Sequence, residues 1–195
     1  MWYEIFVSED MAIENAIGHV EAVVAKLEAQ RDQILRRRVD PLLEILDRGS
    51  FDADLAHTLE LGQAKGFSAA LVFVDIDYFK RVNDSHGHQA GDTVLKGIAQ
   101  ILSAATKGKG DAYRFGGEEL VALLVNTTGQ QAAEVAEGIR RRVEESAFGV
   151  GINVTVSCGV ASYPADGGTA NGLLAAADAA LYQAKRAGRN VVRTA

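Results

Sequence analysis

Two glycines and two glutamates stand together in the stretch "AYRFGGEELVALLV" (112–125), between two runs of residues typical of β-strands. Gly116 and Gly117 fit a hairpin turn, because glycine tolerates a positive φ. Glu118 and Glu119 need another explanation, since neighbouring like charges repel and glutamate is depleted in strands. One interpretation is a solvated hairpin tip. The other is a pair of carboxylates that holds a hard cation, with bare glycine backbone that lets a ligand come close.

A second acidic pair ends the apolar run "AALVFVDID" (69–77). Residues two apart on a strand point to the same face, so either Asp75 or Asp77 can join a site at the strand end. Carboxylate oxygens that converge with few other protein ligands suit Mg²⁺, which keeps water and takes substrate phosphates as further ligands. We expect Asp75 and Glu118 to form the metal pair, and Asp77 to cap the helix that follows.

Polar and basic residues further along the chain have the chemistry to bind a nucleotide. Lys80 lies just past the acidic strand end, where a lysine can neutralise phosphate oxygens. Asn83 and Asp92 supply an amide and a carboxylate, which match the donors and acceptors of guanine, although each alone is more often a cap or turn residue. Lys185 and Arg189 are four residues apart, so they share one face near the end of the last predicted helix. They are either phosphate ligands or a solvated basic turn.

The elements that must position these residues follow from the apolar periodicity. Strands and helices alternate in the order β-α-β-β-α-β with one further helix, which predicts an α+β domain of split βαβ, ferredoxin-like topology. We expect an antiparallel sheet with helices on one face. The predicted elements are the strand "AALVFVDID", the helix "DTVLKGIAQILSAA" with Asp92 as its N-cap candidate, the hairpin "YRFGGEELVALLVN", the helix "QQAAEVAEGIRRRVEESA", the strand "INVTVSCGVASY" and the helix "NGLLAAADAALYQAKRAGRN".

The N-terminal part of the chain has a different pattern. Apolar residues recur at alternating steps of three and four over about three heptads, with one polar layer, as in a coiled-coil seam. An amphipathic helix that packs on its own domain is the alternative. Pro41 ends this helix near Val39, so we expect a dimerisation helix in residues 1–38 and a globular domain in residues 39–195. The seam positions are Ile13, Ala16, Val20, Val23, Leu27, Gln30 and Ile34.

The composition excludes several classes of function. Of the 195 residues, 48% are hydrophobic and 24% are charged, and the net charge is −6. This acidic balance argues against nucleic acid or an anionic membrane as the main partner. No apolar run is long enough to span a bilayer, and the first residues lack the pattern of a signal peptide. The single cysteine, Cys158, is expected to be a core residue of a cytoplasmic protein.

Together these stretches resemble the GGDEF family, the diguanylate cyclases of bacteria, from about Val39 to Asn190. The segment "VDIDYFKRVNDSHGHQAGD" resembles the family pattern D-[IV]-D-x-F-K-x-[IV]-N-D-x-x-G-H-x-x-G-D. "RFGGEEL" resembles the signature [RY]-[YF]-G-G-[DE]-E-F, with leucine in the last place. "VTVSCGVASY" and "ADAALYQAKRAGRN" are similar to a later strand and the last helix of the family.

The resemblance implies a fold like the nucleotidyl-cyclase and polymerase palm, and the condensation of two GTP into cyclic di-GMP with loss of two pyrophosphates. It implies a metal cofactor, Mg²⁺ or Mn²⁺, held by Asp75, the backbone carbonyl of Ile76 and Glu118. Glu119 is then a second metal ligand or the group that helps to deprotonate the attacking 3′-hydroxyl. Glu118, Glu119 and Lys80 are the expected catalytic side chains.

The resemblance also implies which residues bind the GTP substrate. Guanine is expected to be read by two of them, and the phosphates to be held by basic side chains and one backbone amide. The implied set is Asn83 and Asp92 at guanine, Leu42 at the base or ribose, Gly116 and Gly117 as room for the nucleotide, and Lys80, Lys185, Arg189 and the amide of Phe79 at the phosphates.

A homodimer follows from the implied reaction. Each domain holds one GTP, so the 3′-oxygen of one nucleotide must meet the α-phosphate of the other across a two-fold axis. The N-terminal helix is expected to form this dimer and to pass on the signal of an upstream sensor domain. The alternative is a catalytically silent domain that binds GTP or cyclic di-GMP as a receptor. Such members lose the signature acids, whereas Asp75, Glu118 and Glu119 are present here.

Two segments depart from the family pattern. The family usually opens with D-x-L-T-G-L-x-N-R-R, whereas "DPLLEILDRGSF" has Leu43, Glu44 and Asp47 in place of the threonine, glycine and asparagine. In many members an inhibitory product site has the core R-x-x-D, and Lys107 and Gly110 stand at those two positions here. Lysine lacks the planar fork of arginine, and glycine supplies no acceptor. The sequence therefore predicts a cyclase without feedback inhibition through this site.

Overall fold

The computed structural model describes residues 16–26, 28, 38–149, 151 and 153–195, and the chain divides into two compact units, Met1–Arg37 and Arg38–Ala195. In the first unit, residues 16–26 form a helix. Large apolar side chains on this helix are between 44% and 59% exposed, namely Val23, Val24, Ile17 and Val20. Of the predicted seam, Ala16, Val20 and Val23 lie on this helix, and Ile13, Leu27, Gln30 and Ile34 lie outside the described residues.

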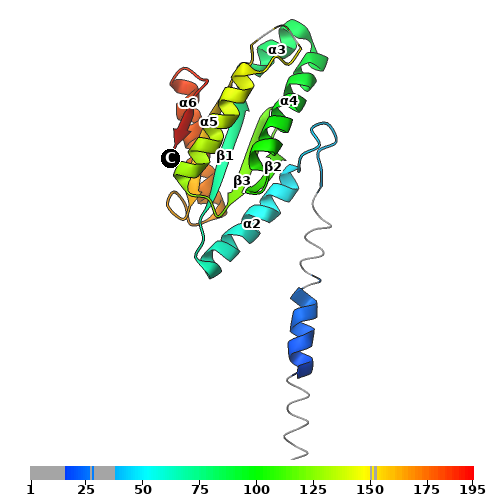
Figure 1. Ribbon diagram of the computed structural model, residues 1–195, viewed down its shortest axis with the longest axis vertical. Helices are drawn as coiled ribbons and strands as arrows, with labels where there is room; N and C mark the ends of the chain where they lie inside the picture. The colour runs from blue at the N-terminus through cyan, green and yellow to red at the C-terminus, as the bar shows by residue number, and fades with distance from the viewer. Residues whose placement is uncertain (1–15, 27, 29–37, 150, 152) are drawn as a thin grey trace, which may run out of the picture. The chain divides into compact units, whose positions relative to one another are not determined.

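The second unit contains the predicted strands and helices, and the split βαβ fold is confirmed (Figure 1). The helix of residues 48–65 and the strand of residues 192–194 were not predicted. The segment between the two strands of the first βαβ half is folded as two helices rather than one. The elements of the second unit are α2 (Arg48–Lys65), β1 (Ala69–Ile76), α3 (Phe79–His86), α4 (His88–Thr106), β2 (Gly110–Arg114), β3 (Glu119–Val125), α5 (Gly129–Glu145), β4 (Val156–Tyr163), α6 (Ala170–Arg186) and β5 (Val192–Thr194).

The described strands form one five-stranded sheet in the order β2-β3-β1-β4-β5. The pairs β2–β3, β3–β1 and β1–β4 are antiparallel, as predicted. The pair β4–β5 is parallel, so the sheet is mixed rather than purely antiparallel. The difference arises because α6 carries the chain back along the sheet, as a crossover helix does between parallel strands. Strand β1 lies at the centre, and all eight of its residues are buried.

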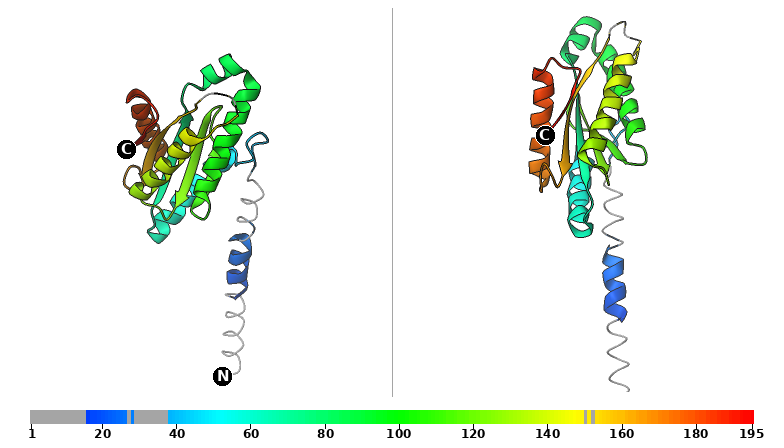
Figure 2. Two further views of the ribbon diagram at one scale, coloured as in Figure 1. Left: turned by 45° about the horizontal axis from the view of Figure 1, so that its top comes forward. Right: turned by 60° about the vertical axis from the view of Figure 1, so that its left-hand side comes forward.

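Helices cover both faces of the sheet, so the prediction that they lie on one face is wrong. Side chains alternate along β1, so that Val72 and Val74 pack in one apolar cluster with residues of α4 and α5. Leu71 and Phe73 pack in a second cluster with residues of α2 and α6. In the right-hand view of Figure 2, the red helix α6 lies on one side of the strands and the green and yellow helices α4 and α5 lie on the other. No helix in the described ranges is both long enough and apolar enough to cross a membrane.

Helix α4 starts earlier than the sequence pattern indicates. Gly87, with φ 81°, is the residue before its first turn, and the helix begins at His88. Asp92 therefore lies inside α4 and is not its N-cap. Its side chain is free of a capping role, and its position one turn into the helix places it near the short α3–α4 connection.

The segment before α2 is the one that departs from the family pattern. Glu44 has φ 59° in the left-handed region, where the family has a glycine that adopts this conformation without strain. Leu43 is buried in the core, in place of a threonine. Asp47 is the N-cap of α2 and accepts a hydrogen bond from the backbone N–H of Ser50 at 2.8 Å, which an asparagine would also do. Despite the substitutions, the helix α2 is therefore capped at its N-terminus and the segment before it packs against the core.

Arg114, the last residue of β2, joins this segment to the hairpin tip. Its Nη1 donates to Asp40 Oδ2 at 3.0 Å. Its Nε donates to the carbonyl oxygen of Gly116 at 3.1 Å, and its Nη2 donates to that of Gly117 at 2.9 Å. The backbone of Leu46 also bonds to the edge of β2, because the Arg114 N–H donates to the Leu46 carbonyl oxygen at 2.7 Å. One guanidinium thus fixes the two carbonyls of the tip.

Candidate active site

The register between the two central strands brings carboxylates together at one end of the sheet. Asp75 on β1 pairs directly with Glu119 on β3, and residues that pair in this way point to the same face. Like charges opposite each other destabilise a sheet. Asp75 is also only 5% exposed. Such a pair, between the buried central strand and its neighbour, indicates a place where a positive group is held.

We call this end of the sheet, with the carboxylates of Asp75, Glu118 and Glu119, the acidic edge. Lys185 supplies a positive group to it. Its Nζ lies 2.8 Å from Asp75 Oδ2. Even so, burial raises the pKa of Asp75 above its ordinary value, because desolvation of the carboxylate outweighs the attraction of Lys185. Burial also raises the pKa of Glu118, and the negative charges of Asp75 and Glu119 add to that effect. The edge therefore carries more negative charge than the one lysine neutralises.

The glycines of the hairpin tip act differently from what the sequence indicates. Neither Gly116 nor Gly117 has a φ in the left-handed region. A Cβ at Gly116 would collide with Glu119 Oε2, so this glycine makes room for the carboxylate. A Cβ at Gly117 would meet nothing within 4 Å, so the backbone there is open to an approaching group. The tip is closed by the N–H groups of Phe115 and Gly116, which both donate to the Glu119 carbonyl oxygen, at 2.9 and 3.1 Å.

The residues of the acidic edge fit a divalent cation that takes further ligands from water and substrate. Among the described residues, no three side chains of the carboxylate, imidazole or thiolate type converge closely enough to cage an ion on their own. Mg²⁺ does not require such a cage, because it is bound through one or two carboxylates and substrate phosphates. Asp75 and Glu118, whose pKa values are both raised by burial, are suited to this arrangement.

Asp77 is not a helix cap and does not join the acidic edge. The residue before α3 is Tyr78, and no side chain caps that helix. The Asp77 carboxylate instead accepts hydrogen bonds from the hydroxyls of Thr155 and Ser157, both at 2.7 Å. It also accepts one from the backbone N–H of Asn190 at 3.0 Å. The two aspartates of the "VDID" stretch thus have different partners. Asp75 forms an ion pair with Lys185, whereas Asp77 accepts hydrogen bonds that join β1 to the start of β4 and to the end of the chain.

The predicted guanine readers come from two consecutive helices. The Asn83 side chain of α3 lies against Gly91, because a Cβ there would collide with Asn83 Oδ1. Asp92 is the next residue of α4 after Gly91. The ring of Phe79 also approaches Gly91, at 3.1 Å from the position of a Cβ. Glycine at this point is what lets the side chains of Asn83 and Phe79 pack directly against α4.

The remaining predicted site residues lie at the start of α3, at the end of β1 and in the segment before α2. Lys80 is exposed on the first turn of α3. Phe79 is the first residue of α3, so its amide N–H has no acceptor within the helix and is available to an anion. Leu42 is half-buried and packs against the apolar cluster that contains Phe79. Ile76, the last residue of β1, is buried next to Asp75.

Arg189 contacts Tyr78 at the start of α3, and residues of α6 line a pocket beside Lys185. The Arg189 guanidinium lies 4.3 Å from the centroid of the Tyr78 ring, and its Nη1 donates to the Tyr78 hydroxyl at 3.2 Å. Sequence reasoning missed Tyr78, Asp178 and Tyr182. The last two could have been found, since they precede Lys185 by seven and three positions and so share its helix face. With Glu119 and Lys185 they line a pocket of about 280 Å³, whose other lining residues are Ala179 and Leu181.

The fold defines a class of protein with a palm-like sheet, and here carboxylates gather at one end of its central strands. Residues 37–191 match the family described as "Diguanylate cyclase, GGDEF domain". The chain therefore belongs to the GGDEF family of diguanylate cyclases. Over 139 residues it is 42% identical to Diguanylate cyclase A of Treponema denticola, which covers 70% of this chain and 38% of that protein.

Solved structures agree with this assignment. The coiled coil and GGDEF domain of DgcB from Caulobacter crescentus, in complex with c-di-GMP, has a TM-score of 0.75 and 29% identity, covering 94% of this chain and 99% of that one. The active GGEEF domain of a diguanylate cyclase from Vibrio cholerae has a TM-score of 0.72 and 31% identity, covering 76% and 96%. The chain spans between 20% and 54% of the length of the curated relatives it matches.

A divalent cation is expected to raise the melting temperature of the protein, and to do so more at neutral than at acidic pH. The raised pKa values of Asp75 and Glu118 mean that the folded state binds protons more tightly than the unfolded state. The metal-free protein therefore loses stability as the pH rises through these pKa values, because both carboxylates then ionise side by side. A cation that replaces the protons restores this stability.

Melting curves with and without Mn²⁺ or Mg²⁺, between about pH 4 and pH 8, measure this effect. Asp75→Asn is the matched control, since it removes one of the two charges and should abolish the increment due to the metal. An increment of the same size in that variant would show that the metal binds elsewhere.

Proposed function

We propose that the protein is an active diguanylate cyclase, which condenses two GTP into cyclic di-GMP with release of two pyrophosphates. The observation that carries this proposal is the acidic edge itself, in which Asp75, Glu118 and Glu119 gather beside Lys185 in a member of the GGDEF family. The Vibrio cholerae domain, named as active, has a GGEEF signature, so glutamate in the third place of the signature is compatible with activity in a relative. Because the proposed substrate, GTP, is supplied in the cytoplasm, we propose that the enzyme acts there.

In this proposal the protein acts by positioning the nucleotide and by neutralising its charge. Asp75, the carbonyl of Ile76 and Glu118 hold Mg²⁺ or Mn²⁺, which when bound polarises the phosphate and offsets its developing charge. Glu119 is a further metal ligand or accepts the proton of the attacking 3′-hydroxyl. Its side chain lies over Gly116, beside the open backbone of Gly117.

Basic groups are assigned to the phosphates and polar groups to the base. Lys185 exchanges its ion pair with Asp75 for a phosphate when nucleotide and metal are present, so that each partner keeps an opposite charge. Lys80 and the amide of Phe79 bind phosphate oxygens at the start of α3, with Arg189. Asn83 and Asp92 read the guanine edge across Gly91, and Leu42 contacts the base or ribose.

The proposed reaction needs two copies of the chain. One acidic edge holds one GTP, and each 3′-oxygen attacks the nucleotide held by the other copy. The exposed apolar side chains of residues 16–26 support a dimer through the N-terminal helix. So does the likeness to DgcB, whose structure comprises a coiled coil and a GGDEF domain and covers 94% of this chain.

Incubation of the protein with GTP and Mg²⁺ tests the proposal, with separation of the products by chromatography. We expect cyclic di-GMP and pyrophosphate in a ratio of one to two, and no product with Asp75→Asn. A protein that binds GTP without forming the dinucleotide would instead be a receptor, and the proposed activity would be wrong.

Cyclic di-GMP is expected not to inhibit the enzyme through the surface around residues 107–110. Lys107 and Gly110 line a hollow of about 920 Å³, together with Lys109 and Arg142. A Cβ at Gly110 would collide with the carbonyl oxygen of Leu123 on β3, so this backbone does not accommodate the aspartate of the R-x-x-D core. Each charge-assisted contact that is missing forgoes roughly 1.5–3 kcal/mol of binding.

Initial rates measured against added cyclic di-GMP check this prediction, and they should stay unchanged at micromolar product. If strong inhibition occurs, Lys107→Met shows whether the hollow is responsible: inhibition that persists in this variant would place the dinucleotide on another surface.

A further inference from the structure

Two consecutive residues in the left-handed region follow the last helix. Arg189 has φ 68° and Asn190 has φ 48°, directly after Gly188 with φ 111°. Side chains other than glycine seldom adopt this conformation, and it persists only where the surroundings fix it. Asparagine tolerates it better than arginine does. The contacts of these residues therefore show what holds the end of α6 in place.

The backbone of Asn190 is tied to the end of the central strand. Its N–H donates to Asp77 Oδ2 at 3.0 Å. Asp77 is only 5% exposed, and its carboxylate also accepts the hydroxyls of Thr155 and Ser157. The acceptor is thus itself fixed by two further bonds, so the position of the Asn190 backbone relative to β1 is well determined.

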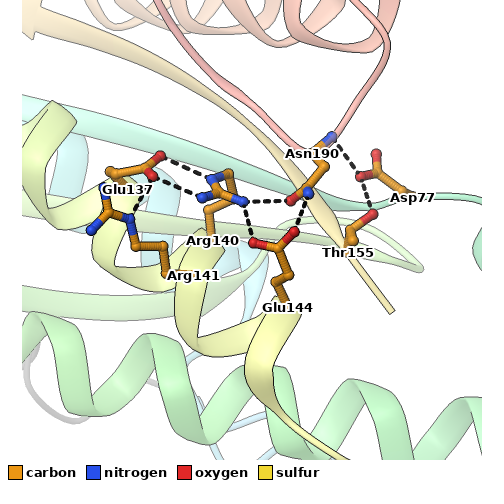
Figure 3. Close-up of polar contacts among 7 residues, drawn as sticks. All are labelled: Asp77, Glu137, Arg140, Arg141, Glu144, Thr155 and Asn190. Atoms are coloured by element: carbon orange, nitrogen blue, oxygen red, sulfur yellow. Dashed lines mark hydrogen bonds and ion pairs between the residues drawn. The ribbon is translucent and has the colours of Figure 1, made fainter. Parts of the chain in front are cut away.

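The side chain of Asn190 forms hydrogen bonds with two residues of α5, Arg140 and Glu144, which also pair with each other (Figure 3). Arg140 Nη1 donates to Asn190 Oδ1 at 2.8 Å, and Asn190 Nδ2 donates to Glu144 Oε1 at 2.7 Å. Arg140 Nη1 also lies 2.8 Å from Glu144 Oε2, and Arg140 Nη2 lies 2.8 Å from Glu137 Oε1. Arg140 lowers the pKa of Glu137 to about 2, so this pair stays ionised at any physiological pH. The Arg140 side chain is only 13% exposed.

Arg189, the residue before Asn190, has contacts of a different kind. Its guanidinium stacks on Tyr78, and its positive charge acts on the carboxylate of Asp75. The side chain of Asn190 points instead toward α5, where Arg140 and Glu144 receive it (Figure 3). A change in the backbone at 190 would rotate the neighbouring residue 189 as well, because the two share a peptide unit.

We infer that Arg140 and Asn190 are positioning residues of the nucleotide site. They lock the left-handed turn after α6, and the turn directs Arg189 toward the phosphates of the nucleotide. The inference rests on the proposed function, in which Arg189 is a phosphate ligand. It means that α5, whose residues do not line the acidic edge, contributes to nucleotide affinity through one arginine.

Equilibrium binding of 3′-deoxy-GTP to the full chain tests the inference, because this nucleotide lacks the 3′-hydroxyl and does not condense. Arg140→Met is expected to weaken its binding about tenfold, the equivalent of one charge-assisted hydrogen bond. The affinity for guanosine, which has no phosphate, should stay the same. Arg141→Met is the matched control. Arg141 donates to the same Glu137 at 2.8 Å, but it lies on the far side of Glu137 from Asn190 (Figure 3).

Asn190→Gly is a second variant that leaves the pairs of Arg140 with both glutamates intact. Glycine adopts the left-handed conformation readily but has no side chain to bond to α5, so this variant should show the same loss of 3′-deoxy-GTP affinity. In an Arg189→Met background, Arg140→Met should have no further effect, since its only route to the phosphates has been removed.

Three results would overturn the inference: both variants bind 3′-deoxy-GTP like the unaltered protein, guanosine binding falls in parallel, or the loss due to Arg140→Met persists in the Arg189→Met background. The proposed function fails separately, when the unaltered protein binds 3′-deoxy-GTP but makes no cyclic di-GMP from GTP. Absence of 3′-deoxy-GTP binding by the unaltered protein would overturn both.

Discussion

Glu118→Gln is expected to abolish the formation of cyclic di-GMP while the protein stays folded. The substitution removes one of the two carboxylates proposed to hold the metal, and charge stabilisation by a bound metal is worth several kcal/mol, so turnover should fall about a thousandfold or more. Glu118 lies in the tip between β2 and β3 and contributes no apolar packing to either cluster of the core.

The folded state should if anything gain stability, since the pKa of Glu118 is raised by burial and by the charges of Asp75 and Glu119. Replacing the carboxylate by a neutral amide removes that repulsion. A melting temperature equal to or above that of the unaltered protein, measured without metal, would accompany the loss of turnover.

Glu145→Gln is the matched control for this experiment. Glu145 is exposed at the end of α5, and the same chemical change there should leave turnover and melting temperature alone. Near-normal activity in Glu118→Gln, measured as initial rate at saturating GTP, would show that Glu118 is not a metal ligand in the reaction.

Val20→Asp combined with Val23→Asp is expected to separate the dimer and to reduce the activity steeply at low protein concentration. The two side chains are 59% and 44% exposed on the helix of residues 16–26, and they occupy the predicted seam. Two charges per chain in an apolar seam oppose the association of two helices. Because turnover needs two chains, the loss should shrink as the protein concentration rises.

Sedimentation velocity and initial rates over a range of protein concentrations measure the two effects together. Ala22→Asp with Ala25→Asp is the control, since it adds the same charge to the same helix away from the seam. Unchanged dimers in the Val20 and Val23 variant would show that the seam does not hold the dimer. An equal loss in the control would point to the charge itself.

The order of the elements was predictable because apolar periodicity reports which residues face the core. The same signal also indicates that helices lie on both faces of the sheet, contrary to the prediction of helices on one face. Strand β1 reads "AALVFVDI" without polar alternation, and a strand that is apolar at nearly every position is buried on both faces. Helices on both sides of the sheet follow from that. Strand β5, with three residues, is too short for any pattern to register.

The acidic edge was partly predictable, since strand ends and hairpin tips are set by local sequence. Its basic and structural partners were not, because they depend on contacts between distant segments. The Arg140–Asn190 bond joins residues 50 positions apart, and the Asp77–Asn190 bond joins residues 113 positions apart. A single sequence assigns Asp77 to a helix cap because the cap is the nearest role, whereas the tertiary fold brings three other donors to it. Asp92 was misplaced for a local reason, since Gly87 and the polar residues after it look like a loop.

The guanidinium of Arg114 makes the hairpin tip and the segment around Asp40 a single cooperative unit. These two residues are 74 positions apart, yet release of Asp40 takes away the charge partner that orients Arg114 over the carbonyls of Gly116 and Gly117. Local opening of one segment therefore opens the other. Amide hydrogen exchange in both should report one shared opening free energy, lower than that of the sheet. On heating, the signature loop would lose its order together with the chain that enters the domain, while the central strands remain protected.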